Sequence, residues 1–109
     1  MYFLAGQSNM VGQGQVSELG PPYNEPQTDV HYWNGTEWLS LAPGFGADSE
    51  KFGPEVSFGR AVKDAYPDDE IYLIKYAVGG TTLYNDWSPE GEGGPQYQQF
   101  MATTRAALA

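Results

Sequence analysis

The chain has 109 residues, which suits one small domain, and 40% of them are hydrophobic, as in a globular rather than a disordered protein. Its 14 acidic and 5 basic residues give a net charge of −9, which disfavours nucleic acid, anionic membranes and phosphate groups as partners and leaves neutral sugars and their esters. The absence of cysteine excludes disulfides and thiolate metal sites, and no apolar window reaches the roughly 18 residues of a membrane span.

The chain opens on a short apolar run, residues 2–5, which predicts a buried strand that stops at Gly6. Residues 7–12 are expected to form a turn or the start of a helix. Residues 13–28 are rich in Gly, Pro, Asn and Gln and are predicted to be a loop.

A hairpin is predicted over residues 30–38. Asn34-Gly35 is the pair typical of a two-residue type I′ turn, and aromatic residues flank it on both sides. Residues 43–53 are again expected to be a loop.

The clearest helix is predicted over residues 53–67. Pro54 suits its first position, Glu55 in the first turn favours the helix dipole, and Pro67 ends it. The i, i+3, i+4 spacing predicts one buried face, formed by Phe58, Ala61, Val62, Ala65 and Tyr66.

A second strand is predicted over residues 71–78 and stops at Gly79-Gly80. Residues 85–94 are expected to be a loop, and residues 95–108 an amphipathic helix. The residues that share a face of this helix are Tyr97, Phe100, Met101, Thr104 and Leu108.

This order of elements predicts an α/β fold with parallel strands and right-handed crossovers. Ligands of such sheets bind beyond the carboxyl ends of the strands. Two such ends, "AGQSN" and "AVGGT", are polar and glycine-rich, and we expect them to lie side by side.

Ser8 follows the first strand end directly. A serine hydroxyl becomes a nucleophile when a base takes its proton, and its own N–H together with that of Gly80 could form an oxyanion hole. The residues therefore allow acyl transfer at Ser8. They also allow Ser8 to be a simple helix N-cap, which is the more common role of a serine in this position. The stretch is not a G-x-S-x-G elbow, because position 10 is methionine.

"FLAGQSNMVG" (3–12) resembles the first motif block of the SGNH-hydrolase superfamily, in its carbohydrate esterase branch of sialate O-acetylesterases and acetylxylan esterases. Three further stretches are similar to that branch in the same order: "HYWNGTEWLSLAP" (31–43), "GPEVSFGRAV" (53–62) and "YAVGGTTLYNDW" (76–87). The resemblance runs from residue 2 to the last residue and implies a three-layer α/β/α flavodoxin-like fold and removal of acetyl groups from carbohydrates without a cofactor.

Carried over by position, the resemblance makes Ser8 the nucleophile and an oxyanion donor. Gly80 is the second donor, with Gly79 beside it. The candidate pocket or substrate-contacting residues are Gln7, Asn9, Glu55 and Trp87. For Glu55, the residues alone allow the simpler role of a first-turn carboxylate.

The family's third block and its final Asp-x-x-His block, which supplies the base, have no match here. The one histidine, His31, stands in the predicted hairpin and is expected to be structural; a lone histidine also cannot build a zinc site. We therefore expect residues 1–109 to be the N-terminal portion of one esterase domain, apparently truncated, with a second chain or a C-terminal half as partner.

Two other functions stay open. Tyr32, Trp33, Trp38, Tyr84 and Trp87 could stack on sugar rings in a carbohydrate-binding module. Alternatively, the chain could be an inactive interaction fragment, because two central strands are marginal alone and an unpaired edge invites association.

Overall fold

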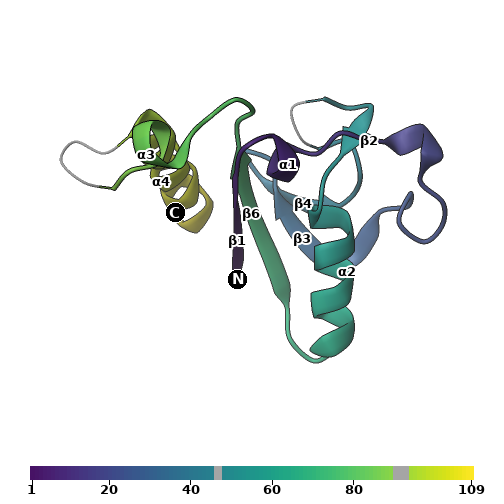
Figure 1. The fold of residues 1–109 in the computed structure, drawn as a ribbon. Coiled ribbons are helices and arrows are strands. Elements are labelled where there is room, and N and C mark those ends of the chain that lie inside the picture. Colours follow the sequence, from purple (N-terminus) through teal and green to yellow (C-terminus); the bar gives the residue numbers. More distant parts are fainter. Residues whose placement is uncertain (46–47, 90–93) are drawn as a thin grey trace.

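The computed structural model describes residues 1–45, 48–89 and 94–109. Its centre is a four-stranded sheet in which β1, β6 and β3 are parallel and β4 is antiparallel to β3 (Figure 1). The strands, in spatial order, are β1 (Tyr2–Gly6), β6 (Ile71–Ala77), β3 (Gln27–Trp33) and β4 (Trp38–Leu41).

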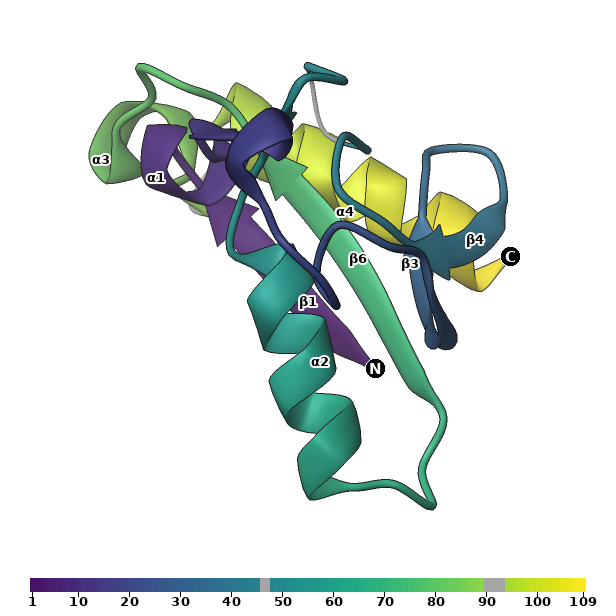
Figure 2. The ribbon, with the colours of Figure 1, turned by 90° about the vertical axis from the view of Figure 1, so that its right-hand side faces the viewer.

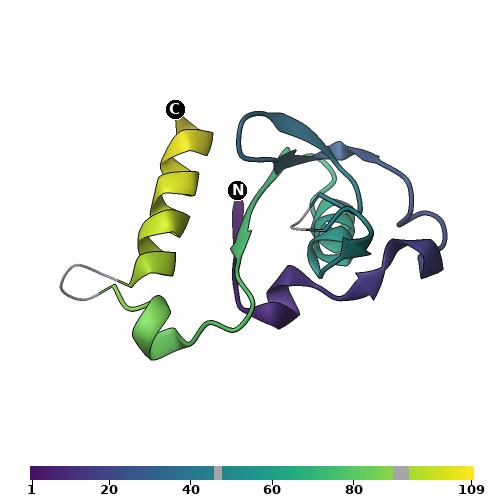
Figure 3. The ribbon, with the colours of Figure 1, turned by 90° about the horizontal axis from the view of Figure 1, so that it is seen from above.

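Two helices cover the two faces of this sheet. Figure 3 shows α2 (Glu55–Ala65) on one side and α4 (Pro95–Leu108) on the other, with the strands between them. The arrangement confirms the predicted α/β fold with three layers, and β1 and β6 are adjacent and parallel as expected.

Five short elements of the described residues lie outside the four-stranded sheet; the first was predicted as a turn or the start of a helix, and the other four were not predicted. They are α1 (Ser8–Val11), β2 (Gly14–Gln15), the 3₁₀ turn η1 (Val16–Glu18), β5 (Lys51–Phe52) and α3 (Leu83–Asp86). The strands β2 and β5 pair with each other in an antiparallel ribbon. Parts of the predicted loops 43–53 and 85–94, namely 46–47 and 90–93, lie outside the described residues.

The core is divided by the sheet into two clusters. Under α2, the cluster contains Leu4, Val30, Tyr32, Leu41, Ile71 and Leu73. Under α4, a smaller cluster contains Trp33, Ile74 and Ala107, with Trp38 packed against it. The division follows from the alternation of side chains along β3 and β6, which sends neighbouring residues to opposite faces.

The buried face of α2 differs from the prediction. Ala61, Ala65 and Tyr66 are exposed, and Val56, Gly59 and Glu55 are buried instead. Gly59 lies so close to the sheet that an ideal Cβ there would be 2.5 Å from Leu41 Cδ2. The helix therefore turns its smallest residue towards the sheet. This close approach depends on tertiary packing, and the spacing of apolar residues along the helix does not predict it.

The face of α4 is likewise only partly as predicted. Thr104 is buried, but Ala107 takes the next buried position, and Leu108 is exposed.

The hairpin between β3 and β4 is present, but its turn is not type I′. Residues 34–37 form a longer loop in which Gly35 has a φ of 106° and Asn34 does not have a positive φ. A type I′ turn needs a positive φ at both central residues. The Asn34 side chain stabilises the loop instead, since its Oδ1 accepts hydrogen bonds from the N–H groups of Thr36 and Glu37.

One edge of β1 is open within the described part of the chain, because β1 pairs there with β6 alone. Val78 N–H donates to the Gly6 carbonyl at 3.1 Å, so Gly6 turns its peptide groups towards β6. Peptide groups alternate along a strand, and those of Phe3 and Ala5 therefore face the open edge.

Candidate active site

The carboxyl ends of β1 and β6 bring the two predicted polar stretches together. Gly6 is paired with Ala77, so the residues that follow each strand leave the sheet at the same edge. In Figure 2, α1 and α3 lie at this end of the two strands. An ideal Cβ on Gly79 would be 3.8 Å from Ser8 Cβ, which places Gly79 directly beside the serine.

Ser8 is the first residue of α1 and is half-buried. The side-chain oxygen of Gln7 accepts hydrogen bonds from both the N–H and the hydroxyl of Ser8. Gln7 is thus the N-cap of this one-turn helix, and Ser8 itself is not the cap. The cap interpretation of Ser8 is therefore wrong, and its hydroxyl is held by a neighbouring amide.

Gly80 follows Gly79 with a φ of 74°, a left-handed conformation that favours glycine, and no heavy atom lies within 4 Å of an ideal Cβ there. The space beside the Gly80 Cα is therefore unfilled by the described residues. Asn9, in contrast, is an exposed residue of α1.

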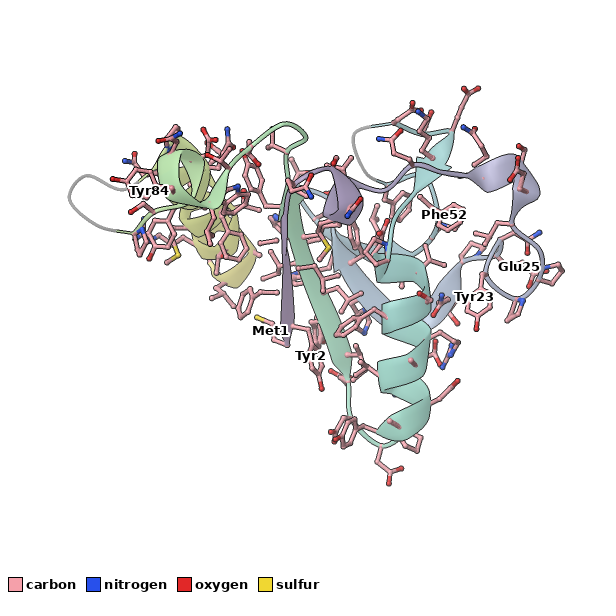
Figure 4. All side chains as sticks on the ribbon, viewed as in Figure 1. Met1, Tyr2, Tyr23, Glu25, Phe52 and Tyr84 are labelled. Atoms are coloured by element: carbon pink, nitrogen blue, oxygen red, sulfur yellow. The ribbon has the colours of Figure 1, made fainter. Side chains whose placement is uncertain are left out.

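A pocket of about 340 Å³ adjoins Gly6 and Gln7 on the side of α3 and α4. Its walls include Trp87, whose Nε1–H donates to Thr81 Oγ1 at 3.0 Å and whose ring lies 6.3 Å from that of Phe100. The neighbouring Tyr84 projects from α3 away from the rest of the molecule (Figure 4) and is 87% exposed. Trp87 is therefore part of a mainly apolar pocket that reaches Gln7, and Ser8 is not among its lining residues.

Glu55 lies beneath the site rather than in it. Its side chain is 1% exposed and forms an ion pair with Lys75, with 2.8 Å between Oε2 and Nζ. Burial, and then the Glu55 charge, raise the pKa of the nearby Tyr32 hydroxyl well above its usual range. A carboxylate this deeply buried has a structural role. Its partner, Lys75, was not predicted from the sequence. The only signal for it was a single lysine within the apolar stretch 71–78.

His31 lies far from this site. Its ring stacks on that of Tyr72 at 4.5 Å, and its β-strand partner on β6 is also Tyr72. Ala77 is five positions beyond Tyr72 on β6, which is roughly 16 Å along a strand. His31 therefore packs in the sheet, as expected, and is too distant to take a proton from Ser8.

Residues 1–45, 48–89 and 94–109 contain no cluster of three or more metal-binding side chains. None of the helices in this part of the chain has the length and apolarity needed to cross a membrane.

The mostly parallel sheet makes this an α/β protein. Its candidate site lies where ligands of such sheets bind, at the carboxyl end of β1, where α1 begins with Ser8. The family of carbohydrate esterases described as sialic acid-specific acetylesterases has a sequence profile that matches residues 1–109. The chain belongs to this family.

A solved structure shows the same fold. It is a protein of Arabidopsis thaliana, known from an X-ray structure at 1.6 Å resolution, with a TM-score of 0.76 and 24% sequence identity. The similarity covers 95% of this chain and 49% of that one, so the present chain spans about half the length of this structural neighbour. None of the curated proteins has a significantly similar sequence.

Proposed function

We propose that residues 1–109 are the N-terminal portion of an SGNH-type esterase domain that removes O-acetyl groups from carbohydrates, with Ser8 as the nucleophile. The observation that carries this proposal is the position of Ser8 just after β1 and beside Gly79, where an ideal Cβ would be 3.8 Å from Ser8 Cβ. Family membership supports ester hydrolysis, and the net charge of −9 suits a neutral substrate.

In the proposed reaction, Ser8 Oγ bonds to the acetyl carbonyl carbon and the carbonyl oxygen becomes an oxyanion. The bond to the sugar oxygen then breaks, that oxygen takes up the serine proton, and water later hydrolyses the acetyl-serine. The N–H groups of Ser8 and Gly80, with Gly79 as the neighbouring donor, stabilise the oxyanion. Because Ser8 N–H now donates to Gln7, the Gln7 side chain must turn aside when substrate binds.

The proton of Ser8 needs an acceptor, and we propose that it is a histidine supplied from outside residues 1–109. General-base assistance is worth about 10²–10⁴-fold in rate. His31 is held away by its place in β3. Residues 1–109 alone should therefore be a poor catalyst.

Hydrolysis of p-nitrophenyl acetate tests the nucleophile. We expect slow release of nitrophenol and a single added acetyl group on Ser8. Both should be lost in Ser8→Ala and kept in Ser17→Ala, which changes an exposed serine of η1. Acetylation of other side chains with Ser8 unmodified would exclude the proposal. Rapid turnover that depends on Ser8 would show that a base is already within reach.

We further propose that the open edge of β1 is covered by a parallel strand from the remaining half of a longer domain. The structural neighbour is about twice as long as the aligned region, and Phe3 at this edge is 49% exposed. Exposed edges with apolar side chains are templates for pairing. In native mass spectrometry and hydrogen exchange, we expect a monomer of 1–109 with fast exchange at the Phe3 and Ala5 amides.

A stable dimer with protected Phe3 and Ala5 amides would assign the edge to a second copy of the chain instead. Slow exchange of both amides in a proven monomer would show that the edge is satisfied internally, and the proposed partner would then be excluded.

Carbohydrate binding without chemistry is the second candidate, and the exposed Tyr84, which follows the pocket residue Leu83 in α3, favours it. Tyr32 and Trp33 cannot take part, since both are buried in the core. Titration with acetylated xylan or sialic acid, followed by tryptophan fluorescence, would support binding alone if the sugar binds and Ser8 is never acetylated.

A further inference from the structure

Lys75 is a charged side chain buried between the sheet and the turn that carries Ser8. Its side chain is 4% exposed, and its ammonium group donates to Glu55 Oε2 at 2.8 Å and to the Val11 carbonyl at 3.1 Å. A buried charge is costly unless it is paired and hydrogen-bonded. Both contacts of Lys75 therefore matter to the energy of this region.

Gly53 is the point where the three segments around Lys75 meet. An ideal Cβ on Gly53 would be 2.8 Å from the Val11 carbonyl oxygen, from Glu55 Oε2 and from Lys75 Nζ. Its N–H donates to the other Glu55 oxygen, Oε1, at 3.2 Å. The end of α1, the start of α2 and the middle of β6 are thus joined around one small residue.

The contact to Val11 acts on α1 as a whole, because α1 is a single turn. Val11 N–H donates to the Gln7 carbonyl and Gly12 N–H to the Ser8 carbonyl, both at 3.0 Å. The last carbonyls of a helix lack donors within the helix, and a lysine there also suits the helix dipole. Holding the Val11 carbonyl therefore holds Ser8, three residues earlier in the same turn.

We propose that Lys75 is a positioning residue for Ser8, acting through the Val11 carbonyl, and that Glu55 serves by neutralising and orienting Lys75. This inference rests on the proposed role of Ser8 as nucleophile. Under this proposal, Glu55 stabilises Lys75 and does not contact the substrate.

Amide hydrogen exchange in residues 1–109 tests the clamp. Lys75→Met alone would leave Glu55 buried without its partner, so the main variant is Lys75→Met/Glu55→Gln, which removes both charges and keeps an acceptor for Gly53. Loss of a hydrogen bond to a charged group should speed exchange at Val11 and Gly12 roughly tenfold. Exchange at Leu73 and Ile74, in the centre of β6, should not change.

A matched control removes a different ion pair, with Arg60→Gln/Asp29→Asn on α2 and β3. It should leave α1 exchange unchanged. Equal acceleration at Leu73, Ile74 and α1 in the main variant would indicate a general loss of stability and would overturn the proposal. Unchanged exchange at Val11 and Gly12 would overturn it as well.

The rate of Ser8 acetylation by p-nitrophenyl acetate gives the second readout, and it should fall in the main variant at an unchanged unfolding midpoint. Equal rates in wild type and variant would overturn the positioning role. If wild-type Ser8 is not acetylated at all, the nucleophile assignment fails, and the exchange data still decide whether Lys75 clamps α1.

Discussion

Gly12 and Gly53 pack backbone against backbone: an ideal Cβ on Gly12 would lie 2.2 Å from Gly53 Cα and 2.3 Å from the Phe52 carbonyl oxygen. Gly12 is buried and has a φ of 93°, which side chains rarely adopt. We expect Gly12→Ala to destabilise the fold by about 3 kcal/mol or more, because strain and a backbone clash combine. Urea unfolding measures the loss.

Gly20→Ala is the matched control, since its φ is not positive and no heavy atom lies within 4 Å of its ideal Cβ. This variant should be unchanged or more stable by up to about 1 kcal/mol. Equal effects at Gly12 and Gly20 would contradict the close packing of α1 on Gly53.

The cluster under α4 should depend on Ile74, which is fully buried against Trp33 and Ala107. Ile74→Ala removes apolar burial and leaves a cavity, at an expected cost of about 2–5 kcal/mol in the free energy of unfolding. Leu83→Ala, at a residue that is 82% exposed, should change stability by less than about 0.5 kcal/mol. A small effect at Ile74 would mean that α4 does not pack as described.

The loop of the hairpin should depend on the Asn34 side chain. Asn34→Ala removes the acceptor of the Thr36 and Glu37 N–H groups, which lie 2.9 and 2.8 Å from Oδ1, and should cost about 1 kcal/mol. Asn34→Asp keeps an acceptor and should lose less. Thermal unfolding of the two variants compares them, and an equal loss would show that the hydrogen bonds to Oδ1 are not the cause.

The ion pair between Asp29 and Arg60 predicts a pH dependence. Arg60 donates two hydrogen bonds to the Asp29 carboxylate, at 3.0 and 2.8 Å, and this contact lowers the pKa of Asp29. A lowered pKa in the folded state gives stability that is present above the unfolded pKa of about 3.9 and is lost as the pH falls through the folded value.

Asp29→Asn should therefore lower the free energy of unfolding by less than about 1 kcal/mol at pH 7, because the ion pair is partly exposed. Below the folded-state pKa of Asp29, the substitution should not change the free energy of unfolding. Urea unfolding at both pH values measures the difference. Asp68→Asn, in the exposed turn after α2, controls for net charge. A cost at Asp29 that persists in acid would contradict the electrostatic origin.

The main elements could be predicted from the sequence because their signals are local. Proline and glycine bound the stretch 53–67, and "IYLIKYAV" is apolar enough to form a central strand. Local signals also place Ser8 and Gly79 at strand ends, so parallel pairing brings them together. The buried face of α2 could not be predicted, since it depends on how closely Gly59 approaches Leu41.

Three other features were not predicted, each for a different reason. The predicted type I′ turn does not form, because Asn34 Oδ1 accepts a hydrogen bond from the Glu37 N–H and the connection becomes a longer loop. The ion pair between Glu55 and Lys75 joins residues twenty positions apart that only the fold brings together. Ribbon strands such as β2 and β5 are too short to leave a pattern in the sequence.

The two hydrophobic clusters on opposite faces of the sheet differ in size, so the two helical layers are held to the sheet by different amounts of apolar contact. The layer with α2 rests on six buried residues, and the layer with α4 on three. Sub-global opening starts where the fewest apolar contacts hold an element. Of the two helices that cover the sheet, we therefore expect α4 to separate before α2, and Phe100, which α4 contributes to the wall of the Trp87 pocket, to move with it. The shape of that pocket is then coupled to the local opening of α4.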